Sequence, residues 1–61
     1  MNDKLLKPYK GFTIEKSWEI NADGTIKKNS VIYAAYNQSG DPFDACNNLA
    51  KLKKKIDIYV N

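Results

Sequence analysis

The sequence of 61 residues contains no histidine, no arginine and one cysteine, Cys46. Without histidine and with a single thiol, one chain can assemble neither a zinc site of soft ligands nor a Cys-His catalytic pair. Cys46 also has no partner for an internal disulfide, a bond that small secreted domains usually carry in numbers. We therefore expect an intracellular protein in which Cys46 is a small buried residue rather than a reactive thiol.

All ten basic residues are lysines, and seven acidic residues leave a net charge of +3. Bidentate recognition of guanine is usually performed by arginine, so the absence of arginine argues against sequence-specific DNA binding. A modest positive charge still favours acidic partners, nucleic acid among them.

Long apolar runs and glycine-rich loops are also absent. No segment approaches the roughly 18 apolar residues of a membrane span, and residues 1–7 hold no hydrophobic stretch of signal-peptide length. The three glycines, Gly11, Gly24 and Gly40, are isolated and form no phosphate-binding loop. We expect a cytoplasmic protein with no membrane segment and no cofactor.

The composition that remains is that of one small folded domain, residues 1–61. Hydrophobic residues make up 43% of the chain, with one tryptophan, four tyrosines and two phenylalanines. A chain of this length buries only about 60% of the surface of its unfolded form, so we expect marginal stability.

A long β-hairpin over residues 9–37 is the strongest structural prediction. Residues 12–20 alternate between apolar and polar side chains, with Lys16 as the one break on the apolar side. Asp23-Gly24 supplies a hairpin turn, and residues 31–36 are rich in β-branched and aromatic residues. Residues 27–30 form a polar break in the return strand, which we interpret as a bulge. Residues 1–8 are expected to be a lead-in segment, whose Leu5 and Leu6 either cover one end of the core or dock a partner.

Two interpretations compete for residues 42–46. In one, they form a short third strand at the sheet edge, where Pro42 is tolerated, and Asn47 or Asn48 caps a helix. In the other, Asp41 caps a longer helix that has Pro42 in its first turn. Both predict a helix over residues 48–60, with one apolar stripe made of Leu49, Leu52, Ile56 and Tyr59. The predicted fold class is α+β, a small antiparallel sheet packed against one C-terminal amphipathic helix.

The pairs of acidic residues in the sequence are weak candidates for a catalytic or metal site. Glu15 and Glu19 lie about 13 Å apart along a strand, too far for the usual glycosidase carboxylate pair. Asp41 and Asp44 lack the further oxygen ligands that a metal site needs. We expect no catalytic residues, no metal site and no enzymatic activity.

Lysines and aromatic residues are the remaining candidates for binding. A solvated helix face is the favoured explanation of the helical lysines, and contact with phosphates is the alternative. Tyr33 and Tyr36 have opposite strand parity, so at least one tyrosine should be exposed. Nucleic-acid-binding candidates are Lys27, Lys28, Lys51, Lys53, Lys54 and Lys55, and protein-binding candidates are Tyr9, Trp18, Tyr33 and Tyr36.

Three segments carry a resemblance to known proteins: residues 9–14, residues 33–40 and residues 49–57. In these the chain resembles small β-β-β-α proteins of phages and mobile elements of low-GC bacteria. That resemblance implies an accessory protein that binds and blocks a host defence or regulatory protein. The outline is also similar to the arm-binding domain of tyrosine integrases, in which a three-stranded sheet enters the DNA major groove. The arginines expected on such a DNA-binding sheet are missing here.

Two functional hypotheses follow. The first is a protein-interaction module that inhibits or modulates a host protein through exposed aromatic residues or a free strand edge. The second is a small basic module that binds nucleic acid through the lysine-rich helix or the sheet. Homodimerisation is compatible with both.

Overall fold

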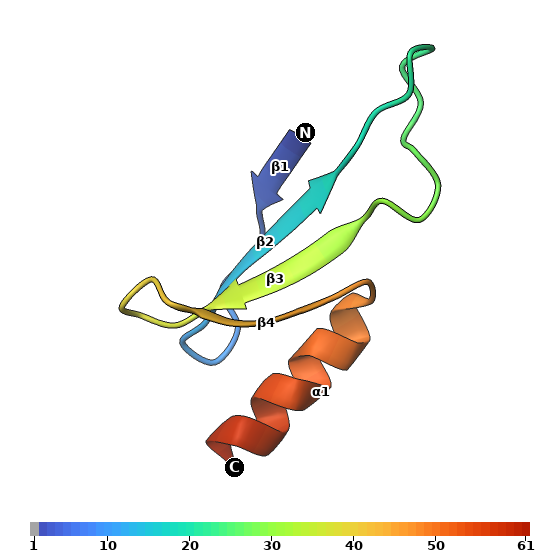
Figure 1. The fold of residues 1–61 in the computed structure, drawn as a ribbon. Coiled ribbons are helices and arrows are strands. Elements are labelled where there is room, and N and C mark those ends of the chain that lie inside the picture. The colour runs from blue at the N-terminus through green and yellow to red at the C-terminus, as the bar shows by residue number, and fades with distance from the viewer. Residues whose placement is uncertain (1) are drawn as a thin grey trace.

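The computed structural model describes residues 2–61, so Met1, the first residue of the expected lead-in, lies outside the described residues. It contains four strands and one helix: β1 (Asn2–Leu5), β2 (Thr13–Trp18), β3 (Ile32–Tyr36), β4 (Pro42–Cys46) and α1 (Leu49–Val60). The strands form one antiparallel sheet in the order β1-β2-β3-β4, a simple meander (Figure 1). The predicted α+β class is confirmed, with one strand more than expected.

The additional strand is β1, in the segment expected to be a lead-in. Tyr9 and Phe12 exchange two backbone hydrogen bonds of 2.9 Å. Between them, Lys10 and Gly11 have φ angles of 49° and 85°. Two central residues with positive φ are typical of a two-residue hairpin turn, which folds the preceding residues back onto β2. Gly11 is therefore a residue of the turn that joins β1 to β2.

The predicted hairpin is present, but its strands are shorter than expected. Pairing between β2 and β3 stops at Ser17, and beyond it Ile20 and Ile26 form an isolated bridge. The turn at residues 21–25 closes through a hydrogen bond from the Asn21 amide to the Thr25 carbonyl. Residues 27–30 form a second turn instead of a bulge, with Asn29 at a φ of 63°. We call residues 19–31 the arm; it projects away from the helix (Figure 1).

Residues 42–46 form a strand, so the interpretation of a helix beginning at Pro42 is wrong. The β3–β4 register shifts beside Tyr36, which leaves Phe43 as the extra residue of a bulge. Asn48 caps α1: its side-chain oxygen accepts hydrogen bonds from the backbone amides of Ala50 and Lys51. This confirms the predicted start of the helix at Leu49.

The core lies between the helix and one face of the sheet. Its buried members are Phe12, Ile14, Ala35, Leu52 and Ile56. Leu52 and Ile56 belong to the predicted stripe and are fully buried, whereas Tyr59 at the end of that stripe is 69% exposed. Tyr59 still packs on the rings of Phe12 and Phe43, at centroid distances of 5.9 and 5.0 Å.

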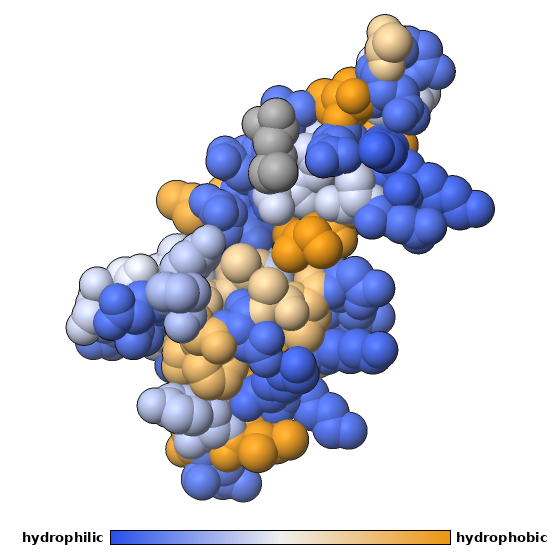
Figure 2. Space-filling view, viewed as in Figure 1, coloured by the Kyte–Doolittle hydropathy of each residue, from blue (hydrophilic) through white to orange (hydrophobic). Residues whose placement is uncertain are grey.

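The molecule is elongated, with principal extents of 43 × 20 × 16 Å. Five buried side chains cannot cover so long a sheet, and apolar surface is exposed near the tip of the arm and again where α1 ends (Figure 2). Ile20 and Ile26 account for it in the arm, and Ile58 and Val60 at the helix end. Within residues 2–61, no helix is long and apolar enough to cross a membrane.

Candidate functional site

The strand register separates acidic from basic side chains across the sheet. Residues that face each other in neighbouring strands share a side of the sheet, and successive residues alternate. Lys16 has the parity of buried Ile14 and faces Lys4, so both lysines lie on the side of α1. Asp3 and Glu15, each one residue earlier in its strand, lie on the opposite side. In β1 and β2 the sheet therefore has an acidic side and a basic side; Asp44 of β4, which faces buried Ala35, lies on the side of α1, where it pairs with Lys55.

The side of the sheet away from α1, which we call the open face, is uncovered. None of its side chains is buried. It contains two acids and no lysine, and its apolar members include Leu5, 66% exposed, and Ile32, 38% exposed. By register the open face comprises Asp3, Leu5, Thr13, Glu15, Ser17, Ile32, Ala34, Tyr36, Pro42 and Ala45.

Both edges of the sheet carry features that discourage strand addition. At one edge, β1 has only four residues and places Asp3 and Lys4 at its centre. At the other edge, β4 starts with Pro42 and contains the bulge at Phe43. Short length, charge, proline and bulges are the usual ways in which edge strands avoid pairing with another chain. The open face is therefore a better candidate for binding than either edge.

Tyr9 is not part of a free aromatic surface. Its hydroxyl donates a hydrogen bond of 2.7 Å to Asp57 in α1, and Lys10 forms an ion pair of 2.6 Å with the same carboxylate. These contacts lower the pKa of Asp57, mainly through Lys10, and the Tyr9 hydrogen bond to Asp57 raises the tyrosine pKa. The Lys53 ammonium lies 5.0 Å from the Tyr9 ring centroid. This cluster fastens the first turn to the helix.

The other three aromatic candidates fall on two sides of the sheet. Tyr36 is half-buried on the open face. Trp18 and Tyr33 lie on the side of α1, next to Lys16, whose ammonium is 5.6 Å from the Trp18 ring and 5.9 Å from the Tyr33 ring. Lys4 faces Lys16 from β1. We call Lys4, Lys16, Trp18 and Tyr33 the lysine–aromatic patch.

The helical lysines do not form one continuous binding face. Lys55 pairs with Asp44 at 3.0 Å, which raises the pKa of the lysine and lowers that of the carboxyl. Lys53 lies over the Tyr9 ring. Lys51 and Lys54 are exposed and, within residues 2–61, have no acidic partner. Only two of these four lysines therefore stand free on the outer surface.

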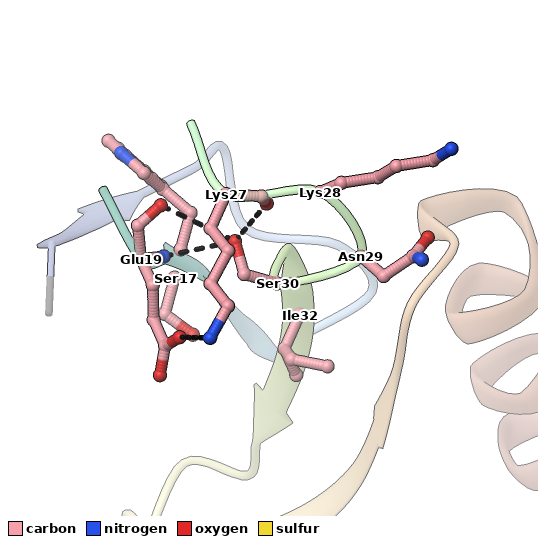
Figure 3. Close-up of a pocket in the computed structure, with 8 residues that line it drawn as sticks. Ser17, Glu19, Lys27, Lys28, Asn29, Ser30 and Ile32 are labelled. Atoms are coloured by element: carbon pink, nitrogen blue, oxygen red, sulfur yellow. Dashed lines mark hydrogen bonds and ion pairs between the residues drawn. The ribbon is translucent and has the colours of Figure 1, made fainter. Parts of the chain in front are cut away.

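A hollow of about 290 Å³ lies at the base of the arm. In Figure 3, Glu19 and Lys27 form an ion pair of 3.4 Å, and Ser30 donates a hydrogen bond of 2.6 Å to the Lys27 carbonyl. The Ser30 hydroxyl also accepts a bond from the Glu19 amide. Lys28 points away from this group (Figure 3). Glu19, Lys27 and Ser30 thus bind one another in the hollow, and within residues 2–61 Lys28 forms no ion pair.

The carboxylates of Glu19, Asp23, Asp44 and Asp57 are held in structural contacts. Asp23 accepts hydrogen bonds from the side chain and backbone of Thr25, which lower its pKa and brace the arm turn. Asp41 lies in the β3–β4 turn and Asp44 pairs with Lys55, so the pair considered for a metal does not converge. In the described part of the chain, no three histidine, cysteine, aspartate or glutamate side chains gather as metal ligands.

The residues that give the two sides of the sheet different charges were not among the candidates predicted from the sequence. Lys16 was noted only as a break in an apolar face, and the charged residues of β1 belonged to a segment expected to have no regular structure. The repeated acid-lysine pairs, Asp3-Lys4 and Glu15-Lys16, were the available signal. In strands, such pairs place opposite charges on opposite faces.

Comparisons with protein-family models, with curated proteins and with solved structures find no match to this chain. Two surfaces stand out: the open face and the lysine–aromatic patch.

Proposed function

We propose that this chain is a non-enzymatic protein-interaction module that binds another protein through the open face. The observation that carries the proposal is an uncovered sheet face with exposed apolar side chains and no lysine, in a chain that has ten lysines. Depletion of lysine and exposure of apolar and tyrosine side chains are typical of the centre of protein interfaces. Tyr36 and Ile32 would supply the main apolar contacts.

The extent of the surface supports a binding role. The accessible surface is 4616 Å² for a mass of 6.9 kDa, whereas an average monomer of this mass exposes about 4000 Å². The radius of gyration is 12.5 Å, compared with about 10.5 Å for a compact chain of 61 residues. The additional surface, about 600 Å², means that the chain by itself covers less of its surface than an average monomer of this mass.

Charge favours a different protein over a second copy of this chain. Two copies packed through the open face would bring the Asp3 and Glu15 carboxylates of both together, and like charges at an interface are unfavourable. A partner with apolar side chains and a lysine or arginine that reaches Glu15 avoids this repulsion. Following the resemblance to phage and mobile-element proteins, we propose a host defence or regulatory protein as the target, bound in the cytoplasm and inhibited or modulated by the contact.

The same charges make DNA recognition by the open face unfavourable. In the integrase-like outline, the sheet would face the phosphates of a major groove, and here it would present two carboxylates to them. A nucleic-acid-binding site would therefore lie on the side of the sheet that faces α1, where Lys4 and Lys16 are found.

Site-specific photo-crosslinking tests the protein-binding proposal. Tyr36 is replaced by p-benzoylphenylalanine, the variant is illuminated in a lysate of low-GC bacterial cells, and the adduct is identified by mass spectrometry. We expect one dominant protein, which then binds the purified chain in solution. The same photoreactive residue in place of Tyr59, on the helix end, should not capture this protein.

Two matched substitutions provide the control. Leu5 on the open face and Ile58 on the helix are 66% and 70% exposed, so Leu5→Asn and Ile58→Asn introduce the same uncharged polar group at similar exposure and place no second carboxylate opposite Glu15. We expect Leu5→Asn to abolish capture and Ile58→Asn to leave it unchanged. Equal capture by both variants, or loss of capture in Ile58→Asn alone, would refute binding through the open face.

A further inference from the structure

We propose that the lysine–aromatic patch is a second binding site, which takes single-stranded nucleic acid. This site is independent of the open face, because its residues lie on the opposite side of the sheet. From the sequence alone, nucleic-acid binding was expected in the lysine-rich helix or the sheet, with Lys27, Lys28 and the helical lysines as the candidates. The structure assigns it instead to Lys4, Lys16, Trp18 and Tyr33.

Lys4 and Lys16 place two positive charges side by side without an acidic partner. Lys4 and Lys16 are direct cross-strand partners on one side of the sheet, an arrangement that is unfavourable for two ammonium groups. Within residues 2–61, neither lysine has a carboxylate within ion-pair distance. An anion placed between them, such as a backbone phosphate, would relieve this repulsion.

The two aromatic rings of the patch lie beside Lys16. Tyr33 is the cross-strand partner of Lys16 in β3, and Trp18 follows Lys16 on the same side of β2. Helix α1 packs near β3 and β4 further along the sheet; Tyr33 contacts the border of the core and Trp18 does not, and both rings remain half-buried. Rings beside lysines let bases stack while phosphates contact ammonium groups, the arrangement that single-strand-binding surfaces use without reading sequence.

The rows of the sheet that form the patch contain no acidic side chain. Two rows of the sheet run through the patch: Asn2 and Trp18 in one, and Lys4, Lys16, Tyr33 and Cys46 in the other. Neither row contains an acid. The helical lysines differ, because Lys55 is paired with Asp44. The patch therefore combines two lysines that have no acidic partner within residues 2–61 with two aromatic rings beside Lys16, and neither of its rows contains a carboxylate that would repel phosphate.

The experiment uses Trp18, the only tryptophan in the chain, as the reporter. We expect oligothymidylate to quench its fluorescence at low salt, with an affinity that falls steeply as salt is added. For the double variant Lys4→Gln/Lys16→Gln, the slope of log affinity against log salt should be smaller by about 1.4, because each phosphate contact to a single strand contributes about 0.7. Its affinity at low salt should fall at least about tenfold.

The matched control is Lys51→Gln/Lys54→Gln, which removes the same charge from the outer face of α1. We expect this variant to retain the salt slope and most of the affinity. The proposal is overturned if oligothymidylate causes no quenching at low salt, or if the two double variants lose affinity equally. Equal quenching by poly-glutamate would reject base stacking, and quenching by thymidine monophosphate but not by the oligomer would reject a strand as the ligand.

Discussion

Replacing Ile56 by alanine should remove most of the stability of the fold. The Ile56 side chain is fully buried, at 0% exposure, in a core of only five buried residues. Truncating a buried isoleucine costs about 2–5 kcal/mol, because the removed methyl groups leave a cavity that the surroundings fill only in part. A domain of this size has a total stability of about 3–9 kcal/mol. Ile56→Ala should therefore lose a large share of the stability and unfold at a much lower urea concentration, whereas Ile56→Val, at about 0.5–1.5 kcal/mol, should lose little.

A neighbouring residue of the same type provides the control. Ile58 lies two positions further along the helix and is 70% exposed, so Ile58→Ala should change the free energy of unfolding by about 0.5 kcal/mol or less. Both variants change helix propensity equally, and the difference between them isolates the burial of Ile56.

Urea unfolding measured by circular dichroism and by Trp18 fluorescence provides the assay. With a slope of about 1 kcal/mol per molar urea, a loss of about 2 kcal/mol lowers the midpoint by about 2 M. Equal midpoints for Ile56→Ala and Ile58→Ala would refute the position of the helix on the sheet. A loss below about 1 kcal/mol for Ile56→Ala would mean that the site collapses around the smaller side chain.

Three further predictions concern the first turn, the charge pattern and pH. Gly11→Ala should lose about 1–3 kcal/mol in the same urea assay, because Gly11 has a φ of +85° and strained backbone of this kind is costly for other residues. Lys4→Glu should raise the urea midpoint, because it converts a like-charge partner of Lys16 into an opposite one. The pKa of Asp57 is lowered in the folded state by Lys10. The Asp57 carboxylate therefore contributes fully to folding stability above its unfolded pKa, about 3.9. This contribution is lost as the pH falls through the lower pKa of the folded state. The urea midpoint should decrease as the pH is lowered below about 4. Asp57→Asn should have a lower urea midpoint than the unmodified chain at neutral pH, and its midpoint should decrease less on acidification. An identical decrease in both proteins would contradict the role of this carboxylate.

The elements with strong local signals were predictable from sequence. The stripe of Leu52 and Ile56 placed the helix on the sheet, and Asn48 marked its start. The turn at Asp23-Gly24 was recognisable because its residues accept positive φ, and Gly24 has a φ of 90°. In each case local propensity and the final packing agree.

The first strand was not predictable by the same reasoning. Asn2–Leu5 has no apolar alternation, and all four of its side chains are exposed. It is a strand because the turn at Lys10 and Gly11 returns the chain onto β2, which supplies its hydrogen-bonding partners. Lysine at positive φ is uncommon, so Lys-Gly is a weaker turn signal than Asp-Gly.

The candidate binding residues were predictable by type but not by grouping. The sequence singled out Trp18, Tyr33 and Tyr36, and their parity separated the two tyrosines correctly. The grouping of Trp18 and Tyr33 with Lys4 depends on the register of a strand that was not expected. Register is a tertiary property, and a shift of one residue would reverse every assignment to a face.

The arm offers a practical position for attaching probes. Its turn at residues 21–25 is exposed and closed by its own hydrogen bonds, which include those between Thr25 and Asp23. Exposed loop tips of this kind usually tolerate insertions. A fluorophore or short epitope introduced between Asp23 and Gly24 would leave the open face, the lysine–aromatic patch and the helix unmodified. The chain could then be immobilised or imaged by its arm while both proposed binding surfaces remain accessible.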